Sequence, residues 1–482
     1  MSLGLEILNI SFLKAIAVGG YAWLRYLKRP LSGTPPIVSL TWNERTNNLP
    51  EALERQIQQH GPVIGLRRDG RVEYIVSDEL TFQVLTDDAT FSFELRTAKI
   101  LRIEFLPSMF GNSIFQDIDS VINKLLTKHL DTMIHRVPPI FERNSAELLK
   151  YCPEGPVNLL PRLQRTVAEA AMSIEILSPL DRDIVIDTAE GVAELIGTFR
   201  SRSILARYFP ALWQIVTWLK VVICTVIIRF GIAFGPLIWT QISAILQKSN
   251  EKPSKNDWSY ERPHRFQVPA LDIGLVVVFI FASVHQTVSI TMWTMFQLAL
   301  HPENQDITRR EIHDLTRRDF VPIPMSELNM RTLRKASCTD SFIREVLRMK
   351  GDAVNLVRMA RKDLQLGDYI VPKGSLVLPL VSLFHWSPRY NEGDPKKLDG
   401  MRWVEKQKAA STTDPGHLSF GLSIWTCPGR FMAVAEIKLA VFALLADTRL
   451  ELVGGRHDVA DNFNVTGNPP EGELVLKRIS VC

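Results

Sequence analysis

The spacing of apolar residues predicts helices through most of the chain between positions 75 and 350. Segments 117–133, 165–200 and 340–349 place apolar side chains three or four residues apart, which is the pattern of an amphipathic helix. No internal repeat or low-complexity tract interrupts this organisation. We therefore expect a fold built mainly from helices.

A near-continuous apolar run begins at Ile273 and continues, through the polar cluster His285, Gln286 and Thr287, to Pro302. Read as one helix, it has about thirty residues and a length of about 45 Å. A helix that is apolar on all sides lies in a large core or in lipid. The polar cluster favours the core, because polar groups are expensive in lipid and can face an internal cavity instead. We predict a long central helix.

Strand signals gather in the last third of the chain. Short β-rich segments are split there by the turn signals Gly367-Asp368 and Pro372-Lys373-Gly374. The predicted strands are 354–359, 364–366, 369–371, 375–380, 450–453 and 473–477. The predicted fold class is therefore mainly α with a small β-region, that is, α+β.

The first residues form a separate apolar segment. Leu3–Leu24 is mostly apolar, is interrupted by Glu6 and Lys14, and ends at Arg25. About 20 apolar residues span a bilayer, positive charge after such a segment keeps the following chain cytosolic, and no small-residue cleavage site is present. The pattern predicts a single-pass anchor over residues 1–29, with a buried or amphipathic helix as the alternative.

A second apolar stretch runs from Phe209 to Leu246. Its uninterrupted part, 221–228, is flanked by Lys220 and Arg229 and is too short to span a bilayer. We expect a buried or membrane-resting helix. The proline-containing linker after the first segment is the one boundary in the sequence, so residues 30–482 are predicted to form a single large domain.

Composition narrows the class of protein. The 482 residues are 46% hydrophobic and 22% charged, which excludes bulk disorder and is too polar for a multi-span membrane protein. The net charge is only +4, and a nucleic-acid binder would need that excess clustered on one face, so no nucleic-acid partner is expected. Five cysteines without regular spacing argue against a disulfide framework or a structural zinc site.

One of the five cysteines has a distinctive setting. Cys427 precedes Pro428-Gly429 at the entry of a strongly predicted helix. Backbone N–H groups and the positive end of the helix dipole lower the pKa of a thiol at such a position. The resulting thiolate is a metal ligand or a nucleophile, and no nearby histidine supplies the base that a nucleophile needs. A buried structural cysteine is the alternative.

The segment around Cys427 resembles the haem-binding signature of the cytochromes P-450, F-G-x-G-x-[R/H]-x-C-x-G. The matching positions are Phe420, Gly421, Cys427 and Gly429. Ser423 replaces a glycine and strains the bend if φ is positive there. Trp425 replaces the basic residue that usually meets a haem propionate. The resemblance implies haem b, with Cys427 as axial ligand and metal ligand and with Phe420 and Trp425 beside the cofactor.

Two further motifs follow the family's order. Glu345 and Arg348 form E-x-x-R, and an i,i+3 pair lies on one face of a helix. The segment Leu398–Trp403 resembles the family's F-x-P-x-R-F element, with Gly400 in place of proline. By this resemblance Glu345, Arg348 and Arg402 form a buried structural triad, in which the loss of one partner is severe.

The resemblance also assigns Arg358, in the β-region, to a haem propionate. The family's W-x-x-x-R motif is not found between residues 120 and 140. Lys128, His129 and Arg136 stay open as alternatives for a further propionate contact. The resemblance covers roughly residues 60–480, and its motifs are dense between 340 and 440.

On the central helix, the family's A-G-x-[D/E]-T is replaced by the sequence from Ala282 to Thr287. His285 takes the position of the acid and Gln286 that of the alcohol, and with Thr287 they are the predicted catalytic residues. A glutamine positions water but does not relay a proton as a hydroxyl does. For His285 the alternative is a polar group satisfied within the core. The predicted pocket residues are Ala282, Val284, Asn355 and Leu356.

The resemblance implies a cytochrome P-450 fold with the long helix over the haem. It implies a membrane-anchored monooxygenase that oxidises an apolar small molecule with O2, the thiolate favouring O–O cleavage. Electrons would come from an NADPH–cytochrome reductase, because the chain carries no flavin or nicotinamide fingerprint. Within the family, the chain most resembles fungal-type microsomal members, which implies secondary-metabolite biosynthesis with terpenoid-like substrates. It also implies a location at the endoplasmic reticulum membrane, with the catalytic domain in the cytosol.

Two alternatives stay open. Gln286 motivates a haem-thiolate isomerase or dehydratase that does not use O2. Ser423 and Trp425 motivate a non-catalytic membrane protein that has lost haem. The substrate and its regiochemistry are not specified by the sequence.

Overall fold

The structure is a computed structural model, and it describes most of the chain after residue 32. The described residues are 33–68, 70–101, 114–151, 155–173, 182–195, 204–221, 223, 280–318, 321–350, 353–354, 356–465 and 467–479. The predicted anchor Leu3–Leu24, the pocket residue Asn355 and most of the stretch Phe209–Leu246 lie outside them. Among the described helices, none is long and apolar enough to cross a membrane.

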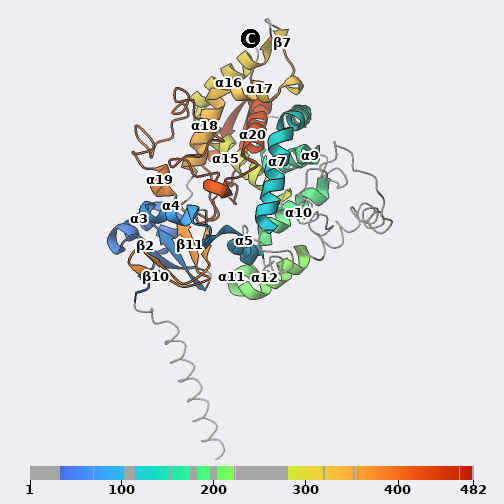
Figure 1. Cartoon of the computed structure of the whole chain (residues 1–482). Coiled ribbons are helices and arrows are strands. Elements are labelled where there is room, and N and C mark those ends of the chain that lie inside the picture. Colours follow the sequence, from blue (N-terminus) through green and yellow to red (C-terminus); the bar gives the residue numbers. More distant parts are fainter. Residues whose placement is uncertain are drawn as a thin grey trace, which may run out of the picture.

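Helices make up most of the described chain, as Figure 1 shows. The α-helices are α2 (Trp42–Thr46), α3 (Leu49–His60), α4 (Asp78–Thr86), α5 (Phe93–Leu101), α7 (Ile114–Ile134), α8 (Pro138–Tyr151), α9 (Leu160–Met172), α10 (Arg182–Leu195), α11 (Ile204–Tyr208), α12 (Pro210–Trp218), α15 (Thr287–Leu300), α16 (Pro302–Leu315), α17 (Met330–Lys335), α18 (Ser337–Met349), α19 (Ser382–His385) and α20 (Arg430–Leu445). Four short helices of other kinds are η6 (Phe281–Gln286, a π-helix) and the 3₁₀ turns η7 (Met325–Glu327), η8 (Ser423–Trp425) and η9 (Val453–Gly455).

The strands form small sheets. The largest has the order β1-β2-β3-β11-β8-β4, with β1 (Ile37–Val38), β2 (Val63–Arg68), β3 (Arg71–Val76), β11 (Leu376–Pro379), β8 (Arg358–Ala360) and β4 (Phe91–Ser92). The others pair β9 (Leu364–Leu366) with β10 (Tyr369–Val371), β6 (Arg317–Arg318) with β7 (Val321–Pro322), and β13 (Leu474–Arg478) with both β12 (Thr448–Leu452) and β5 (Pro156–Val157). The mainly helical class is therefore confirmed.

The β-region was placed in the last third of the chain, and this placement is incomplete. Strands β1 to β4 come from the first part of the chain, and β3 runs parallel to β11, with Val377 opposite Tyr74. The overlooked signal is the Asp69-Gly70 dipeptide between two β-rich runs, where Gly70 has φ of +79°. Such a dipeptide favours a tight hairpin, and β2 and β3 are paired antiparallel around it.

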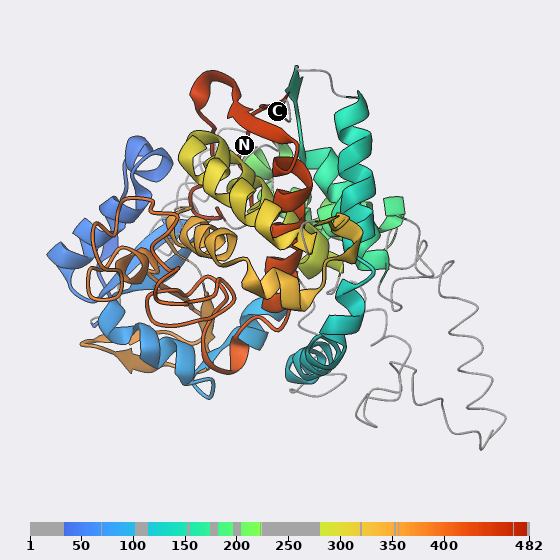
Figure 2. The ribbon, with the colours of Figure 1, turned by 90° about the horizontal axis from the view of Figure 1, so that it is seen from above.

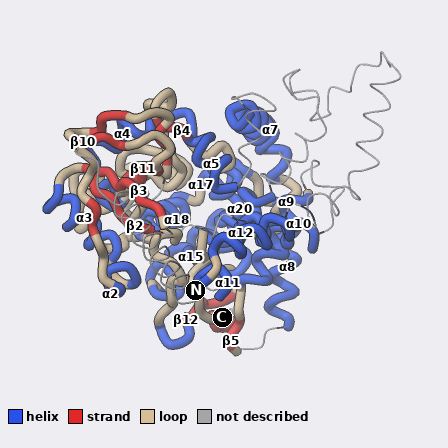
Figure 3. The backbone as a smooth tube through the Cα atoms, turned by 90° about the horizontal axis from the view of Figure 1, so that it is seen from below, coloured by secondary structure: helices blue, strands red, loops and turns tan. Residues whose placement is uncertain are grey.

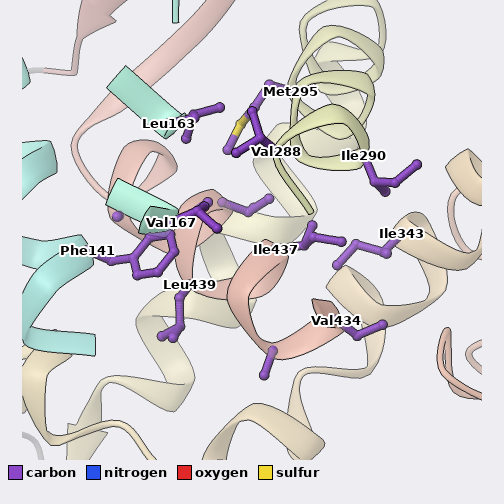
Figure 4. Close-up of a cluster of buried hydrophobic side chains, with 14 of the residues drawn as sticks. Phe141, Leu163, Val167, Val288, Ile290, Met295, Ile343, Val434, Ile437 and Leu439 are labelled. Atoms are coloured by element: carbon purple, nitrogen blue, oxygen red, sulfur yellow. The ribbon is translucent and has the colours of Figure 1, made fainter. Parts of the chain in front are cut away.

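Figures 2 and 3 show the sheet of β2, β3 and β11 with α3 and α4 on one side of the molecule and the long helices on the other. Two separate cores correspond to these sides. The larger lies among α8, α9, α15, α18 and α20, and Figure 4 shows Phe141, Val288, Ile343 and Ile437 converging in it. The smaller packs α3 against the sheet.

The predicted central helix is described from Ile280 to Leu300, as η6 followed directly by α15. Eleven of the fourteen residues of α15 are buried, which fits a helix that is apolar on all sides. The helix lies against α20, α9 and α18. It therefore runs through the larger core, beside the helix that follows Cys427.

Candidate active site

The loop before α20 presents the Cys427 thiol at the start of that helix. The Cys427 N–H donates to the carbonyl oxygen of Phe420 at 2.8 Å and closes the loop. Gly421 has φ of +81°, and a Cβ there would lie 2.7 Å from the Trp425 carbonyl oxygen, so only glycine fits this bend. Ser423 has φ of +62°, as expected if a glycine position is filled by another residue. Left-handed backbone at a residue with a side chain costs about 1–2 kcal/mol.

Burial dominates the electrostatics of the Cys427 thiol. Desolvation raises its pKa, while hydrogen bonds from the backbone of Gly429 and Arg430 and the charge of Arg430 lower it. The Asp119 carboxylate on α7 raises it further, and burial raises the pKa of Asp119 itself to about 6. The net direction is upward, which corrects the lowered pKa expected from the helix dipole. A thiolate here needs a positive centre beside it, such as a bound metal ion.

Trp425 ties the cysteine loop to the region of β4 and α5. Its indole N–H donates to Asp88 Oδ1 at 2.8 Å. Its ring lies 4.8 Å from the Phe93 ring, centroid to centroid. Asp88 Oδ2 is also 3.8 Å from Arg361 Nη2. The side chain at the position of the family's cation thus donates to a carboxylate of the protein itself.

Arg358 on β8 and Arg96 on α5 bring two cations into the same region. Arg358 is 2% exposed, donates from Nη1 to the carbonyl oxygens of Leu356 and Val357 at 3.1 and 3.3 Å, and lies over the Phe93 ring at 5.3 Å. Burial lowers the pKa of Arg358 to about 10, and the charge of Arg96 contributes. Arg96 is half-buried; desolvation lowers its pKa to about 10, and its Nε atom is buried without a hydrogen-bond partner. Two such cations with a buried, unused donor favour an anionic ligand.

Glu345, Arg348 and Arg402 meet in the core. Arg348 Nη2 and Nε donate to the two carboxylate oxygens of Glu345 at 2.6 and 2.9 Å, and Arg402 Nε donates to Oε1 at 3.0 Å. The indole N–H of Trp403 and the backbone N–H of Asp399 donate to the same carboxylate at 3.0 and 3.1 Å. Desolvation raises the pKa of Glu345, but the arginines outweigh it, and the net pKa lies below its ordinary value.

The triad also holds the segment that leads to the cysteine loop. Arg402 donates to the carbonyl oxygens of Asp394 and Lys397 at 2.9 Å each. Gly400 stands where the family has proline, and a Cβ on it would lie 2.7 Å from Phe342 of α18. The departure from the motif therefore permits closer packing of this segment against α18.

The central helix changes geometry at the predicted distal residues. Phe281–Gln286 forms the π-helical segment η6, a kind of irregularity that is frequent at functional sites. Ala282 is exposed and Gln286 half-buried, while Val284 and His285 are buried. The predicted distal residues therefore lie on a distorted turn, with small and polar side chains on its accessible face.

His285 is bonded across the helix to the C-terminal loop. Its Nε2 lies 2.8 Å from the carbonyl oxygen of Gly467, which requires the proton on Nε2. Burial lowers the pKa of His285 and outweighs the raising effect of this bond. Thr287 is also buried, and its carbonyl oxygen accepts from Thr291 Oγ1 at 2.7 Å.

The remaining predicted residues are the pocket residue Leu356 and the three candidates for a further propionate contact. Leu356 precedes Arg358 with φ of +56° and packs against a small cluster that includes Phe384. His129 and Arg136 are exposed, and Arg136 Nη1 donates to the Ser173 carbonyl oxygen at 3.1 Å. The side chain of Lys128 is not among those described.

The sequence did not single out Asp88, Arg96 or Gly467. Asp88 accepts a hydrogen bond from Trp425, Arg96 adds a second, half-buried cation, and Gly467 accepts from His285. These contacts join residues as much as 337 positions apart, and no local spacing rule signals them.

Comparison with known proteins gives one consistent answer. Residues 273–475 match the model of the cytochrome P-450 family. A cytochrome P-450 monooxygenase, calE, of Penicillium decumbens is 30% identical over 202 residues, which is 40% of this chain and 37% of that protein. Another, ltmQ, of Epichloe festucae var. lolii is 30% identical over 218 residues, 43% of this chain and 38% of that protein.

The chain is also similar to a plant enzyme and to a solved cyanobacterial structure. A (1S)-1-hydroxy-luvungin A synthase of Citrus sinensis is 28% identical over 181 residues, 37% of this chain and 35% of that protein. The chain thus covers well under half the length of these relatives. A solved cyanobacterial protein with bound retinoic acid has 20% identity and a TM-score of 0.63, over 93% of this chain and 100% of that one. That likeness shows the fold.

Proposed function

We propose that this chain, which belongs to the cytochrome P-450 family, is a membrane-anchored haem-thiolate monooxygenase. In this proposal it takes O2 and two electrons from an NADPH–cytochrome reductase, inserts one oxygen atom into an apolar small molecule and releases the other as water. The observation that carries the proposal is the partly buried Cys427 in the loop just before α20, after a segment that the Glu345 triad holds.

The residues around Cys427 fit haem b. Its sulfur would hold the iron, and the positive iron would offset the desolvation that raises the pKa of the free thiol. Arg358 and Arg96 would hold the propionates, because Arg358 is a buried cation and Arg96 has a buried donor without a partner. The carboxylate that acts on Arg96 belongs to Glu73, which already pairs with Arg68 and Arg71 at 2.8 Å. When bound, haem with an axial thiolate supplies the activation of O2.

The distal residues would shape the reaction space and order water. Ala282 presents a small apolar surface from η6, suited to an apolar substrate, while Val284 is buried in the larger core. The amide of Gln286 both donates and accepts hydrogen bonds, so it can orient a water molecule, and protons would reach the distal side through such water. The Nε2–H of His285 is engaged with Gly467 instead.

The substrate class follows from the same features and from the relatives. The accessible face of η6 carries the small apolar Ala282 and no charged side chain, which favours an apolar molecule. One relative is named for the synthesis of a hydroxylated product, 1-hydroxy-luvungin A. We place the chain in a secondary-metabolite pathway with terpenoid-like substrates, where it hydroxylates or further oxidises its substrate.

For location, the proposal is the endoplasmic reticulum membrane, with residues 1–29 as the anchor and the catalytic domain in the cytosol. A second contact would come from α11 and α12, which lie side by side at one edge of the molecule in Figure 1. Large apolar side chains there are 50–77% exposed: Ile204, Tyr208, Phe209, Leu212 and Ile215. Deletion of residues 1–29 is expected to release the chain from membranes, and a truncated chain that stays bound would make α11–α12 the main contact.

The test of the activity is isotope incorporation. Full-length protein is combined with a fungal reductase and a panel of mono-, sesqui- and diterpenes under ¹⁸O2. The expected product carries one ¹⁸O atom and forms only when NADPH and reductase are both present. A product that forms without them and without O2 contradicts the monooxygenase assignment.

That contrary outcome describes the second candidate, a haem-thiolate isomerase or dehydratase. The observation in its favour is Gln286 at the position of the family's alcohol, because an amide does not relay protons as a hydroxyl does. Such an enzyme rearranges or dehydrates its substrate and consumes no NADPH.

A further inference from the structure

The chain between β12 and β13 forms a loop that returns to the central helix. The backbone groups of Asp458 and Glu471 exchange two hydrogen bonds of 3.0 and 2.9 Å and close the base of the loop. We call residues 456–473 the C-terminal strap. Gly467 to Pro470, just before the base closes at Glu471, are buried, whereas the two ends of the strap are exposed. One part of the strap is therefore packed into the molecule.

One side of the strap follows the central helix. His285 Nε2–H donates to the Gly467 carbonyl oxygen at 2.8 Å, and Trp293 Nε1–H donates to that of Asn468 at 3.4 Å. The ring of His457 packs edge-on against Trp293, with 5.2 Å between the centroids. The bond to His285 is the shorter and stronger of the two polar links, because 3.4 Å exceeds the usual range for an N–H···O bond.

The other side of the strap reaches the smaller core. The guanidinium of Arg68 on β2 lies 4.9 Å from the centre of the Phe463 ring, and Asn462 donates to the Thr46 carbonyl oxygen. Phe463 packs against the smaller core, whereas Val465 is buried in the larger one. The strap thus bridges the two cores, and its position is set by the places where it is fastened.

We propose that His285 is a positioning residue that fastens the C-terminal strap to the distal segment of the central helix, and that it does not relay protons. The carbonyl oxygen of Gly467 is an amide oxygen, which does not take up a proton at ordinary pH, so this bond holds the Nε2 proton in place and does not pass it on. The bond also satisfies a buried carbonyl, and an unsatisfied one is costly. This inference rests on the proposed function, because only a bound haem makes this segment of the central helix the distal side.

The test measures amide hydrogen exchange of the strap in the full chain. His285→Phe keeps a ring of similar size without a donor, and His285→Gln restores an N–H near the position of Nε2. Thr291→Val is the matched control, because Thr291 is a buried residue of the same helix whose hydroxyl bonds within the helix. We expect exchange in residues 459–472 to rise on the order of tenfold in H285F, because a tenfold change corresponds to the loss of one hydrogen bond, and to stay at the parent level in H285Q and T291V.

Equal exchange in H285F and the parent overturns the proposal. If H285F does not accumulate as folded protein, His285→Asn replaces it, because its shorter side chain stops short of Gly467. A second readout is the fraction of NADPH electrons lost as hydrogen peroxide. H285Q is expected to match the parent, and a peroxide loss in H285Q as large as that in H285F would make residue 285 a proton relay. Exchange is measured without turnover, so a failure of the monooxygenase proposal leaves the result on the strap intact.

Discussion

Near Cys427 one carboxylate collects many hydrogen bonds, whereas the C-terminal strap is joined to the central helix by single, separate hydrogen bonds. Glu345 accepts five hydrogen bonds, from Arg348, Arg402, Trp403 and Asp399. Among the described residues, His285 and Trp293 each donate one hydrogen bond to the strap, which also contacts the smaller core. We call these two regions the proximal and the distal side.

The two sides differ in how many hydrogen bonds fix their geometry. On the proximal side, Ser419 Oγ donates to the Leu347 carbonyl oxygen at 3.0 Å and the Leu418 N–H donates to His385 Nε2 at 3.1 Å, so the cysteine loop is tied to α18 and α19 as well. Redundant bonds fix one geometry, as an axial metal ligand requires. The described part of the distal side has a π-helical turn and few hydrogen bonds to other elements. Its shape can therefore differ from that of relatives while the fold is kept.

The largest effect is expected at the proximal carboxylate. Glu345→Gln removes a fully buried charge from two buried arginines and leaves them unpaired, which costs about 3–5 kcal/mol in the free energy of unfolding. Urea denaturation followed by circular dichroism measures it. The control is Glu392→Gln, whose carboxylate is 83% exposed, and it should change stability by less than about 1 kcal/mol. If both variants lose the same free energy of unfolding, the hydrogen bonds to Glu345 do not stabilise the protein more than an exposed ion pair does.

A pH-dependent weakness is expected within the proximal side, at Glu436 on α20. Burial raises its pKa from 4.5 to about 8. Between these values the folded chain keeps a proton that the unfolded chain has lost, so stability falls as pH rises, by about 1.4 kcal/mol per pH unit. Glu436→Gln removes this titration. It should be more stable than the parent at pH 8 and close to it at pH 5, when the unfolding free energy is measured at both.

The control for this prediction is Glu451→Gln, on an exposed part of β12. It should follow the parent at both pH values. A constant difference between E436Q and the parent across the range would mean that the substitution acts through packing and not through the proton.

A smaller effect is expected at Ser423. Ser423→Gly relieves a positive φ in the cysteine loop and should stabilise the protein by about 1 kcal/mol. Gln407→Gly relieves a similar φ of 50° at an exposed site and serves for comparison. Thermal unfolding measures both. If only Q407G is stabilised, the serine side chain makes a contribution in the loop that offsets the strain.

The smallest effect on stability, and one on function, is expected on the distal side. Gln286→Thr should leave the unfolding free energy within about 0.5 kcal/mol of the parent, because the residue is half-buried on a loosely linked turn. It introduces a hydroxyl, which relays protons as an amide does not. The fraction of NADPH electrons that form hydrogen peroxide should therefore fall. A rise in that fraction would assign to Gln286 a water-ordering role that threonine does not replace.

The sequence predicted the proximal side better than the distal side, for a physical reason. Glu345 and Arg348 lie one helical turn apart, and Cys427 lies between a bend and a helix, so local spacing places them. The central helix was also predictable, since it is apolar on all sides. The bond from His285 to Gly467 joins residues 182 positions apart, and nothing in either segment signals it.

The same reasoning explains two further gaps. Trp425 was expected beside the cofactor, and only the fold brings Asp88 to its indole. The lowered thiol pKa was expected from nearby backbone N–H groups and the helix dipole, while the dominant effect is burial, which depends on tertiary packing. Local motifs predict which side chains are present, and tertiary packing decides what they bind.

The carbon monoxide difference spectrum of the reduced protein tests the central claim most directly. Purified full-length chain should show the Soret band typical of a thiolate-ligated haem, and Cys338→Ala, at the other described free cysteine, should keep it. Cys427→Ala should lose the band while its circular dichroism stays that of a folded helical protein. A parent without the thiolate-type band, or a C427A variant that keeps it, would contradict the assignment of Cys427 as the haem ligand.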